Sequence, residues 1–466
     1  MKVQNLRKKY PRFVYEKYTY KISDSTSSPQ AGNNLEIFFD FKIEPNLKFR
    51  SKIIIENINQ NLPRRNLKKI DNLVFHLGLM EIPSYWKTTC SPEILIKAGS
   101  LNQDQIKWWK DLVIKGMGQF FYENKIDFRK PNFLKIRSLR RFDLYKTDTG
   151  PTCDRYLVPF AGGRDSIITL ESLKKKGEIA LFLVNPNEQI KKVVKVTGVK
   201  KQIIVRRTID KRLLELNKKG YLNGHTPFTA VLSFLSVLCA VLFDYKNIAF
   251  SNEKSADEGN VKYLGKMINH QWAKSSEFER MFKKYCKKYL TKNINYFSYL
   301  RRYGELEISK MITKYPKYFP VFSSCNASMR IGAKQIRWCG NCPKCLFVYV
   351  TLYPFLNKKD LLKIFDKDIF ENKKLLPVMK SLIGQGGPKP FECVGTKKES
   401  QLAFYLSWKK HHHLNNSTYV YLLRYFQDKI LPKYPNLEKE SKKILNSWNN
   451  QHNLPRGFEK RLKNTI

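Results

Sequence analysis

Hydrophobic and polar residues alternate in short segments over the first third of the chain. Residues 35–41 and 53–55 carry strand-forming side chains between proline and asparagine, a pattern that predicts strands. Residues 103–122 carry hydrophobic side chains at three- and four-residue spacing, which predicts a helix. Turn formers and weak periodicity follow over 130–154, and we place a domain boundary near residue 150. Residues 1–150 are expected to form an α+β domain.

From residue 155 the pattern becomes a regular succession of strand, loop and helix. Strands are predicted at 156–160, 179–184, 202–205 and 247–250, and helices at 165–176 and 226–243. Thr226 and Pro227 suit the N-cap and the first position of the second helix. Strands that alternate with helices form parallel units, so we expect an α/β fold with a doubly wound parallel sheet over residues 151–384. Residues 385–466 are expected to form a helical C-terminal extension.

Composition and charge exclude some classes of protein but do not identify a function. A chain of 466 residues with 42% hydrophobic residues can bury a large core, which excludes a disordered protein. The net charge of +46 suits nucleic acid or other polyanions. The basic residues are spread in short pairs without a basic tail, so we do not expect nucleic acid to be the partner. No secretory signal or membrane-length apolar segment is visible, which favours a soluble cytoplasmic protein.

A glycine loop supplies the first candidate chemistry. Residues 157–166 read Leu-Val-Pro-Phe-Ala-Gly-Gly-Arg-Asp-Ser, a strand followed by a two-glycine turn and a helix start. Such a turn lets the backbone approach a phosphate, and the helix N-terminus offers unpaired N–H groups to it. Arg164 adds a guanidinium that can bind a phosphate through two hydrogen bonds. The residues predicted to bind nucleotide phosphates are Gly162, Gly163, Arg164, Asp165 and Ser166.

This loop resembles the Ser-Gly-Gly-x-Asp-Ser loop of the N-type ATP pyrophosphatases (PP-loop enzymes). It is neither the Walker loop nor the Rossmann fingerprint. In this chain Ala161 replaces the first serine, and Arg164 stands where lysine is common. The resemblance implies a sheet of the PP-loop type and cleavage of ATP to AMP and pyrophosphate.

Acidic residues and histidines follow the predicted strand ends. Because ligands bind outside the carboxyl ends of parallel strands, residues 251–260 should emerge on the same edge of the sheet as the glycine loop. Their carboxylates (Glu253, Asp257 and Glu258) could bind Mg²⁺ or a substrate amine, although an acidic turn in solvent explains Asp257 taken alone. His270 and then His225 are the candidates for proton transfer. Glu253 is expected to orient Mg²⁺ or the activated carboxyl group.

Four cysteines form a candidate metal site. Cys339, Cys342 and Cys345 follow one another at two-residue spacing, and Cys325 lies upstream. Four thiolates suit a structural Zn²⁺, whereas iron–sulfur ligation is the rival and free cysteines are the alternative without metal. The cysteines expected to be free and buried are Cys90, Cys153, Cys239 and Cys286.

Several stretches together resemble the ATP-dependent UDP-N-acetylmuramoyl-L-alanyl-L-glutamate epimerases of peptidoglycan synthesis. They span nearly the whole chain in order: 71–81, 98–101, 162–166, 223–227, 251–260, 269–271, 338–345 and 389–396. The resemblance implies conversion of the terminal L-glutamate of a UDP-muramoyl dipeptide to D-glutamate, with ATP cleaved to AMP and pyrophosphate. We expect this to proceed through an acyl adenylate, with Mg²⁺ bound by the acidic residues named above.

Two other classes of protein remain open. A PP-loop enzyme that adenylates or thiolates a tRNA base would fit the charge and the cysteines, and so would a non-enzymatic nucleic-acid-binding protein. Falling RNA affinity with rising salt would support either of them. ATP cleavage that depends on the UDP-muramoyl dipeptide would exclude both.

Overall fold

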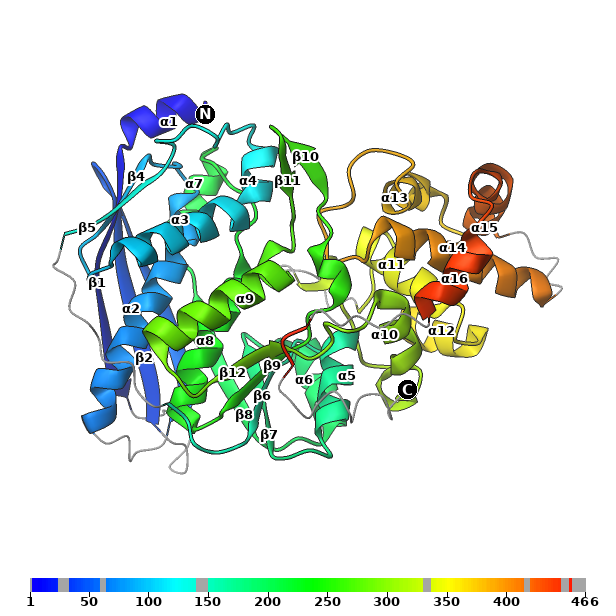
Figure 1. The fold of residues 1–466 in the computed structure, drawn as a ribbon, viewed down its shortest axis with the longest axis horizontal. Coiled ribbons are helices and arrows are strands. Elements are labelled where there is room, and N and C mark those ends of the chain that lie inside the picture. Colours follow the sequence, from blue (N-terminus) through cyan, green and yellow to red (C-terminus); the bar gives the residue numbers. More distant parts are fainter. Residues whose placement is uncertain are drawn as a thin grey trace.

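One ten-stranded sheet organises the computed structural model, which describes residues 2–23, 33–58, 64–139, 150–329, 337–414, 420–445 and 452–454. The strand order is β12-β9-β6-β7-β8-β3-β2-β1-β4-β5, with a separate β10–β11 hairpin (Figure 1). The strands are β1 Arg12–Ser23, β2 Asn33–Ile43, β3 Leu47–Ile58, β4 Glu93–Ile96, β5 Lys135–Ser138, β6 Tyr156–Pro159, β7 Ile179–Val184, β8 Gln202–Thr208, β9 Asn247–Phe250, β10 Val261–Tyr263, β11 Lys266–Ile268 and β12 Asn295–Ser298. The α-helices are α1 Val3–Lys9, α2 Arg64–Trp86, α3 Gln103–Gly116, α4 Gly118–Glu123, α5 Arg164–Leu173, α6 Glu188–Thr197, α7 Lys211–Lys218, α8 Phe228–Phe243, α9 Ser276–Tyr285, α10 Glu305–Ile312, α11 Pro343–Leu352, α12 Lys358–Phe365, α13 Leu376–Leu382, α14 Lys397–His413, α15 Tyr421–Tyr425 and α16 Leu437–Leu445.

The half of the sheet made by β12, β9, β6, β7 and β8 is parallel throughout. Successive side chains of a strand point to opposite faces, and both faces of β6 are buried. Leu157 packs into the core that contains α8, whereas Tyr156 and Val158 pack into the core that contains α5 and α6. Helices therefore cover both faces, and the predicted α/β class with a mostly parallel sheet is confirmed.

The other half of the sheet joins this one without a break. Strands β1, β2 and β3 pair antiparallel, and β3 then pairs antiparallel with β8 from Lys52↔Thr208 to Ile55↔Val205. Residues before and after position 150 thus share one sheet, although the domain boundaries placed near residues 150 and 385 stay predictions.

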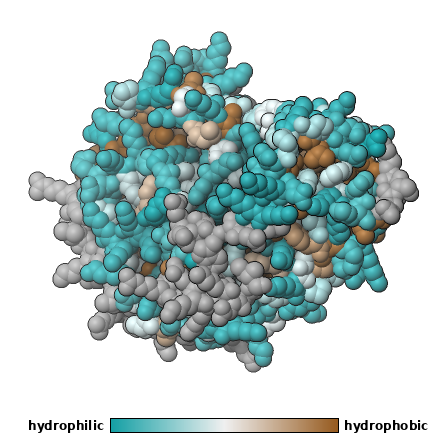
Figure 2. All heavy atoms as spheres, turned by 45° about the vertical axis from the view of Figure 1, so that its right-hand side comes forward, coloured by the Kyte–Doolittle hydropathy of each residue, from teal (hydrophilic) through white to brown (hydrophobic). Residues whose placement is uncertain are grey.

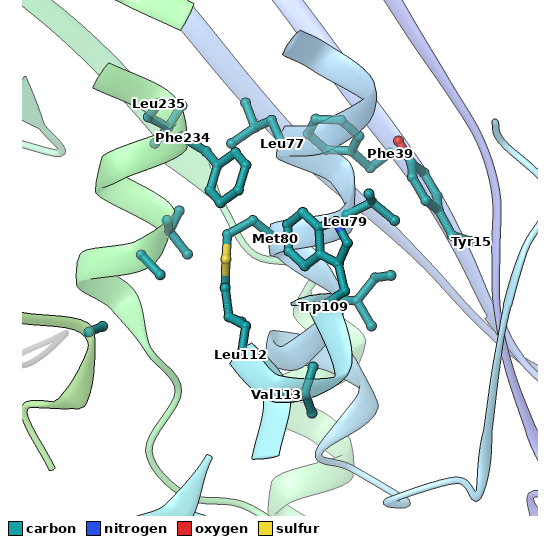
Figure 3. Close-up of a cluster of buried hydrophobic side chains, with 14 of the residues drawn as sticks. Tyr15, Phe39, Leu77, Leu79, Met80, Trp109, Leu112, Val113, Phe234 and Leu235 are labelled. Atoms are coloured by element: carbon teal, nitrogen blue, oxygen red, sulfur yellow. The ribbon is translucent and has the colours of Figure 1, made fainter. Parts of the chain in front are cut away.

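A single hydrophobic core also crosses position 150. Figure 3 shows Met80 of α2 and Trp109 and Leu112 of α3 facing Phe234 of α8. The Trp109 and Phe234 rings stack with their centroids 5.2 Å apart. The packing of α8 therefore depends on helices from the first third of the chain.

The C-terminal helices gather at the end of the molecule opposite β1–β5 (Figure 1). They pack around a second core, which they share with the α5–α6 face of the sheet. The described residues after 385 are helical in α14, α15 and α16, as expected. Helices α10 to α13 already precede that position, so the helical region begins before residue 385.

Some predicted elements differ from the observed ones. The helix predicted over 103–122 is interrupted at Met117, where α3 ends and α4 begins. Pro227, and not Thr226, is the N-cap of α8, and no side chain caps this helix. The N-cap prediction for Thr226 was therefore wrong.

The face of the molecule shown in Figure 2 is mostly polar. Hydrophilic residues cover most of the face in Figure 2, and hydrophobic residues form smaller patches on it. No helix in the described ranges has the length and apolar character needed to cross a lipid bilayer.

Candidate functional site

The candidate site lies where the order of strands reverses. The chain runs from β6 outward through β7 and β8, and returns to place β9 on the other side of β6. In open α/β sheets, this reversal opens a crevice at the carboxyl ends of the two central strands. A cavity of about 330 Å³ lies at these ends, lined by Gly163 and Asp165 after β6 and by Ser251 and Asn252 after β9. The expectation that residues 251–260 and the glycine loop meet on one edge is thus confirmed for the first residues of that segment.

The glycine loop shapes one wall of the cavity. Gly162 has a φ of +73°, and a Cβ there would lie 3.2 Å from a Val193 methyl, so another residue would be both strained and crowded. Gly163 is the N-cap of α5 and lacks a side chain that could satisfy the first helical N–H groups. Ser166 lines the cavity too, and its Oγ donates to the Gly163 carbonyl at 2.9 Å. The loop therefore presents backbone donors beside an open volume, as an anion site requires.

Arg164 does not line this cavity, contrary to its predicted role as a phosphate clamp. Its side chain is 2% exposed and points into the interior, where it pairs with Glu305 of α10. Its Nη1 also donates to Ser309 Oγ at 2.7 Å, and its Nε to Asp165 at 3.0 Å. Burial opposes the charged form, but the carboxylates of Glu305 and Asp165 outweigh it and raise the pKa of Arg164. The guanidinium is thus held in an internal ion pair that links α5 to α10, and it does not face the cavity.

Two lysines that the sequence analysis missed line the cavity instead. Lys344, at the start of α11, is 5% exposed, and Lys274 follows Trp272 in a short 3₁₀ turn. Burial works against ionisation of Asp165, but the charges of Arg164, Lys344 and Lys274 lower the pKa of this carboxyl group. Both lysines were hidden in the sequence because 86 basic residues are scattered along it. Only the fold distinguishes them from surface lysines: Lys344 is buried, and Lys274 is half-buried at the cavity wall.

The two candidate histidines lie together. The ring centroids of His225 and His270 are 4.3 Å apart, and His270 Nδ1 lies 2.5 Å from Gln119 Oε1. Burial, aided by the charges of His270, Lys87 and Lys274, lowers the pKa of His225 to about 3. Burial and Lys274 lower the pKa of His270 to about 4. Both rings are therefore neutral near pH 7.

The three acidic residues after β9 do not converge on one point. Glu253 is 3% exposed. Burial lowers the pKa of Lys274, but the negative charges near it, including that of Glu253, raise this pKa above its ordinary value. Asp257 accepts a hydrogen bond from the Ser276 backbone at the start of α9. Glu258 pairs with Lys389 at 3.2 Å. The latter two carboxylates fasten the loop to its neighbours. Glu253 does not line the cavity either, and it is linked to it through its charge, which helps to raise the pKa of Lys274.

The four predicted metal ligands do come together. The Sγ atoms of Cys325, Cys339, Cys342 and Cys345 all lie within 4.8 Å of one another, and no other group of three or more His, Cys, Asp or Glu in the described residues is so arranged. The closest pairs are 3.5, 3.7 and 3.9 Å apart. Zinc at about 2.3 Å from four tetrahedral sulfurs places them about 3.8 Å apart. The spacing fits one ion, because the thiolates of a multi-iron cluster bind separate irons and lie farther apart.

Backbone geometry supports this cluster. Gly340 has a φ of +70°, which lets the chain turn between Cys339 and Cys342. Backbone N–H groups of Asn341 and Cys345 point at the sulfurs of Cys339 and Cys342 at 3.4 Å. Of the cysteines expected to be free and buried, Cys153 is exposed, which corrects that prediction.

Comparisons with known proteins give one consistent result. Residues 6–299 match the family model of the MurL N-terminal domain, and residues 321–433 match that of the MurL C-terminal domain. The chain is 35% identical over 326 residues to a UDP-N-acetyl-alpha-D-muramoyl-L-alanyl-L-glutamate epimerase of Salinispora tropica, which covers 69% of this chain and 70% of that protein. It is 32% identical over 335 residues to the protein of the same name from Xanthomonas oryzae pv. oryzae, with 70% and 72% covered. No solved structure matches the chain significantly.

Proposed function

The chain belongs to the MurL family of epimerases, and on that premise we propose that it inverts the terminal L-glutamate of UDP-N-acetylmuramoyl-L-alanyl-L-glutamate with the use of ATP. Epimerisation is nearly isoergic, so ATP serves to acidify the α-carbon. Removal of an α-proton beside an ionised carboxylate would place a second negative charge on one group. Conversion of that carboxylate to an acyl adenylate removes its charge, and the carbonyl can then accept the electron pair as an enolate.

The observation that carries this proposal is the cavity at the carboxyl ends of β6 and β9, where the order of strands reverses. Its glycine loop offers the α5 N-terminus to phosphates, and Lys274 and Lys344 bring positive charge to the same cavity. Mg²⁺ that bridges phosphates needs only one or two protein carboxylates, and Asp165 is held ionised at the loop. The proposed phosphate site is therefore Gly162, Gly163, Asp165 and Ser166, with the two lysines in the role first given to Arg164.

The remaining groups have roles beside this cavity. Neither His225 nor His270 lines the cavity, but the charge of Lys274, which does line it, lowers the pKa of both rings. We assign the histidines to substrate positioning or proton transfer, and Glu253 to orienting Mg²⁺ or the activated carboxyl group. The four cysteines would bind one structural Zn²⁺ that fixes the start of α11, and with it Lys344.

The proposal is tested with purified protein, ATP, Mg²⁺ and the UDP-muramoyl dipeptide in D₂O. We expect AMP and pyrophosphate to form only when the dipeptide is present, and deuterium to enter the glutamyl α-carbon as D-glutamate appears. RNA in place of the dipeptide should not support AMP formation. AMP formation that responds to tRNA and not to the dipeptide would reject the epimerase and favour a tRNA-modifying enzyme.

A further inference from the structure

Cys393 is the one cysteine in the nucleotide cavity. It lies between α13 and α14, on a segment that reaches back from the C-terminal helices to the carboxyl end of the sheet, and it lines the same cavity as Gly163 and Asp165. Lys274 Nζ donates to its Sγ at 3.1 Å. The thiol thus lies beside the proposed phosphate site, within hydrogen-bond distance of a cation.

The backbone around Cys393 is held from two sides. Lys344 donates to the Cys393 carbonyl, and its own backbone N–H donates to Glu392 Oε2 at 2.8 Å. On the other side, Gln271 Nε2 donates to the Val394 carbonyl at 3.3 Å. These contacts fix the sulfur relative to both α11 and the turn that carries Lys274. A catalytic base needs such fixed placement.

Lys274 supplies the charge that a thiolate needs. Burial disfavours its charged form, yet Cys393 and Glu253 outweigh burial and raise the pKa of Lys274 above its ordinary value. The ammonium therefore persists in the cavity. Its Nζ donates to the Cys393 sulfur, so the ammonium can hold this sulfur in place beside the cavity.

The histidine pair is less suited to removal of an α-proton. A general base is most effective when its pKa lies near the working pH. The pKa of His225 is about 3 and that of His270 about 4, so both rings are weak bases near pH 7. Cysteine thiolates in general bind a proton more strongly than imidazoles so perturbed. Cys393, which lines the cavity, is therefore a candidate base that the sequence pattern did not suggest.

We propose that the Cys393 thiolate, held by Lys274, is the base that removes the glutamyl α-proton on one face of the activated substrate. The inference rests on the proposed epimerase function. The Cα–H bond breaks, an S–H bond forms, and the electron pair moves into the acyl group as an enolate. A donor on the opposite face then protonates the α-carbon. That donor regains its proton from water, and the thiol returns its own to water.

The test separates adenylation from proton transfer. Cys393→Ala and Cys393→Ser are compared with the parent protein and with Cys153→Ser, whose cysteine is exposed outside this cavity. For both Cys393 variants we expect deuterium entry at the α-carbon to fall at least about 100-fold. Dipeptide-dependent AMP formation should stay within about threefold, and Cys153→Ser should match the parent in both assays.

Each other outcome has a distinct meaning. Exchange within about tenfold of the parent in Cys393→Ala would overturn the inference. Loss of AMP formation and exchange together in Cys393→Ser, at an unchanged melting temperature, would also overturn it and assign the residue to adenylation. A glutamyl adduct on Cys393, found by mass spectrometry after acid quenching, would replace the base with a covalent thioester. If the parent protein forms no AMP with the dipeptide, the proposed function itself fails.

Discussion

At the scale of single residues, Gly163 allows the space around the glycine loop to be tested, because a side chain there would enter the cavity and not the protein core. A Cβ at Gly163 would lie 3.5 Å from the nearest protein atom, Cβ of Ser324, which is an ordinary contact. We therefore expect Gly163→Ala to fold normally and to keep most ATP-dependent activity, whereas Gly163→Val should lower it at least about tenfold by occupying the cavity. Melting temperature and AMP formation measure the two effects. Normal turnover by a folded Gly163→Val protein would refute the assignment of the loop.

The half-buried histidines His225 and His270 make the stability of the protein depend on pH in a specific direction. The pKa of His225 is about 3 in the folded protein, against about 6.5 in an unfolded chain. Between these values the unfolded state binds a proton that the folded state does not, so the free energy of unfolding falls as pH falls from about 6.5. His225→Asn should remove on the order of 1–3 kcal/mol of the loss between pH 7 and 4.

Urea unfolding at several pH values measures this contribution. The control is His413→Asn, because His413 is exposed at the end of α14. The control should retain the full pH dependence of the parent. If the free energy of unfolding falls equally with pH in His225→Asn and in the parent, His225 becomes protonated in the folded state as readily as in the unfolded chain.

At the scale of elements, the ion pair between α5 and α10 explains why Arg164 follows the glycines. Removal of one partner leaves a buried charge uncompensated, so Arg164→Met should lower the free energy of unfolding by about 3–5 kcal/mol. The double variant Arg164→Met, Glu305→Gln should recover part of that loss, because the second change removes the stranded charge. Urea unfolding of both single variants and the double variant gives the coupling energy. An unchanged stability with weakened ATP binding would return Arg164 to the phosphate site.

The cysteine cluster predicts a metal that supports one element, α11. About one equivalent of zinc is expected in the purified protein. Cys342→Ser should lose it, since this residue is both one of the four predicted ligands and the N-cap of α11. Loss of zinc should lower the melting temperature, because metal binding contributes directly to folding. The matched control, Cys153→Ser, should retain the metal. Metal analysis that finds iron, or no metal, would refute this assignment.

At the scale of the whole molecule, the β3–β8 junction makes the two halves of the sheet depend on each other. It is reinforced by a buried ion pair between Arg207 of β8 and Glu81 of α2, with an Nε–Oε1 distance of 2.7 Å. We expect the sheet to unfold in one transition, and residues 151–466 expressed alone to aggregate, because β8 would expose an edge and α8 an apolar face. Circular dichroism and size-exclusion chromatography test this. A soluble fragment that unfolds cooperatively would show that the halves are independent.

The local features of this protein were determined by the sequence itself. The strand predicted at 179–184 and that at 247–250 match β7 and β9, because runs of apolar residues between turn formers specify buried strands. The glycine loop and the cysteine spacing were readable for the same reason, since each depends on neighbours within a few positions. Strand alternation also implied that the loops after β6 and β9 meet at one edge.

Tertiary structure alone decided where side chains point and which distant segments meet. Arg164 was read as a phosphate ligand, yet Glu305 of α10 draws it into the interior. Lys274 meets Cys393 across 119 positions of sequence, and no spacing within either segment predicts that these two side chains meet. The pairing of β3 with β8 is equally invisible in either strand. Burial and charge pairing arise from contacts between residues far apart in the chain, so they follow from the completed fold and not from local periodicity.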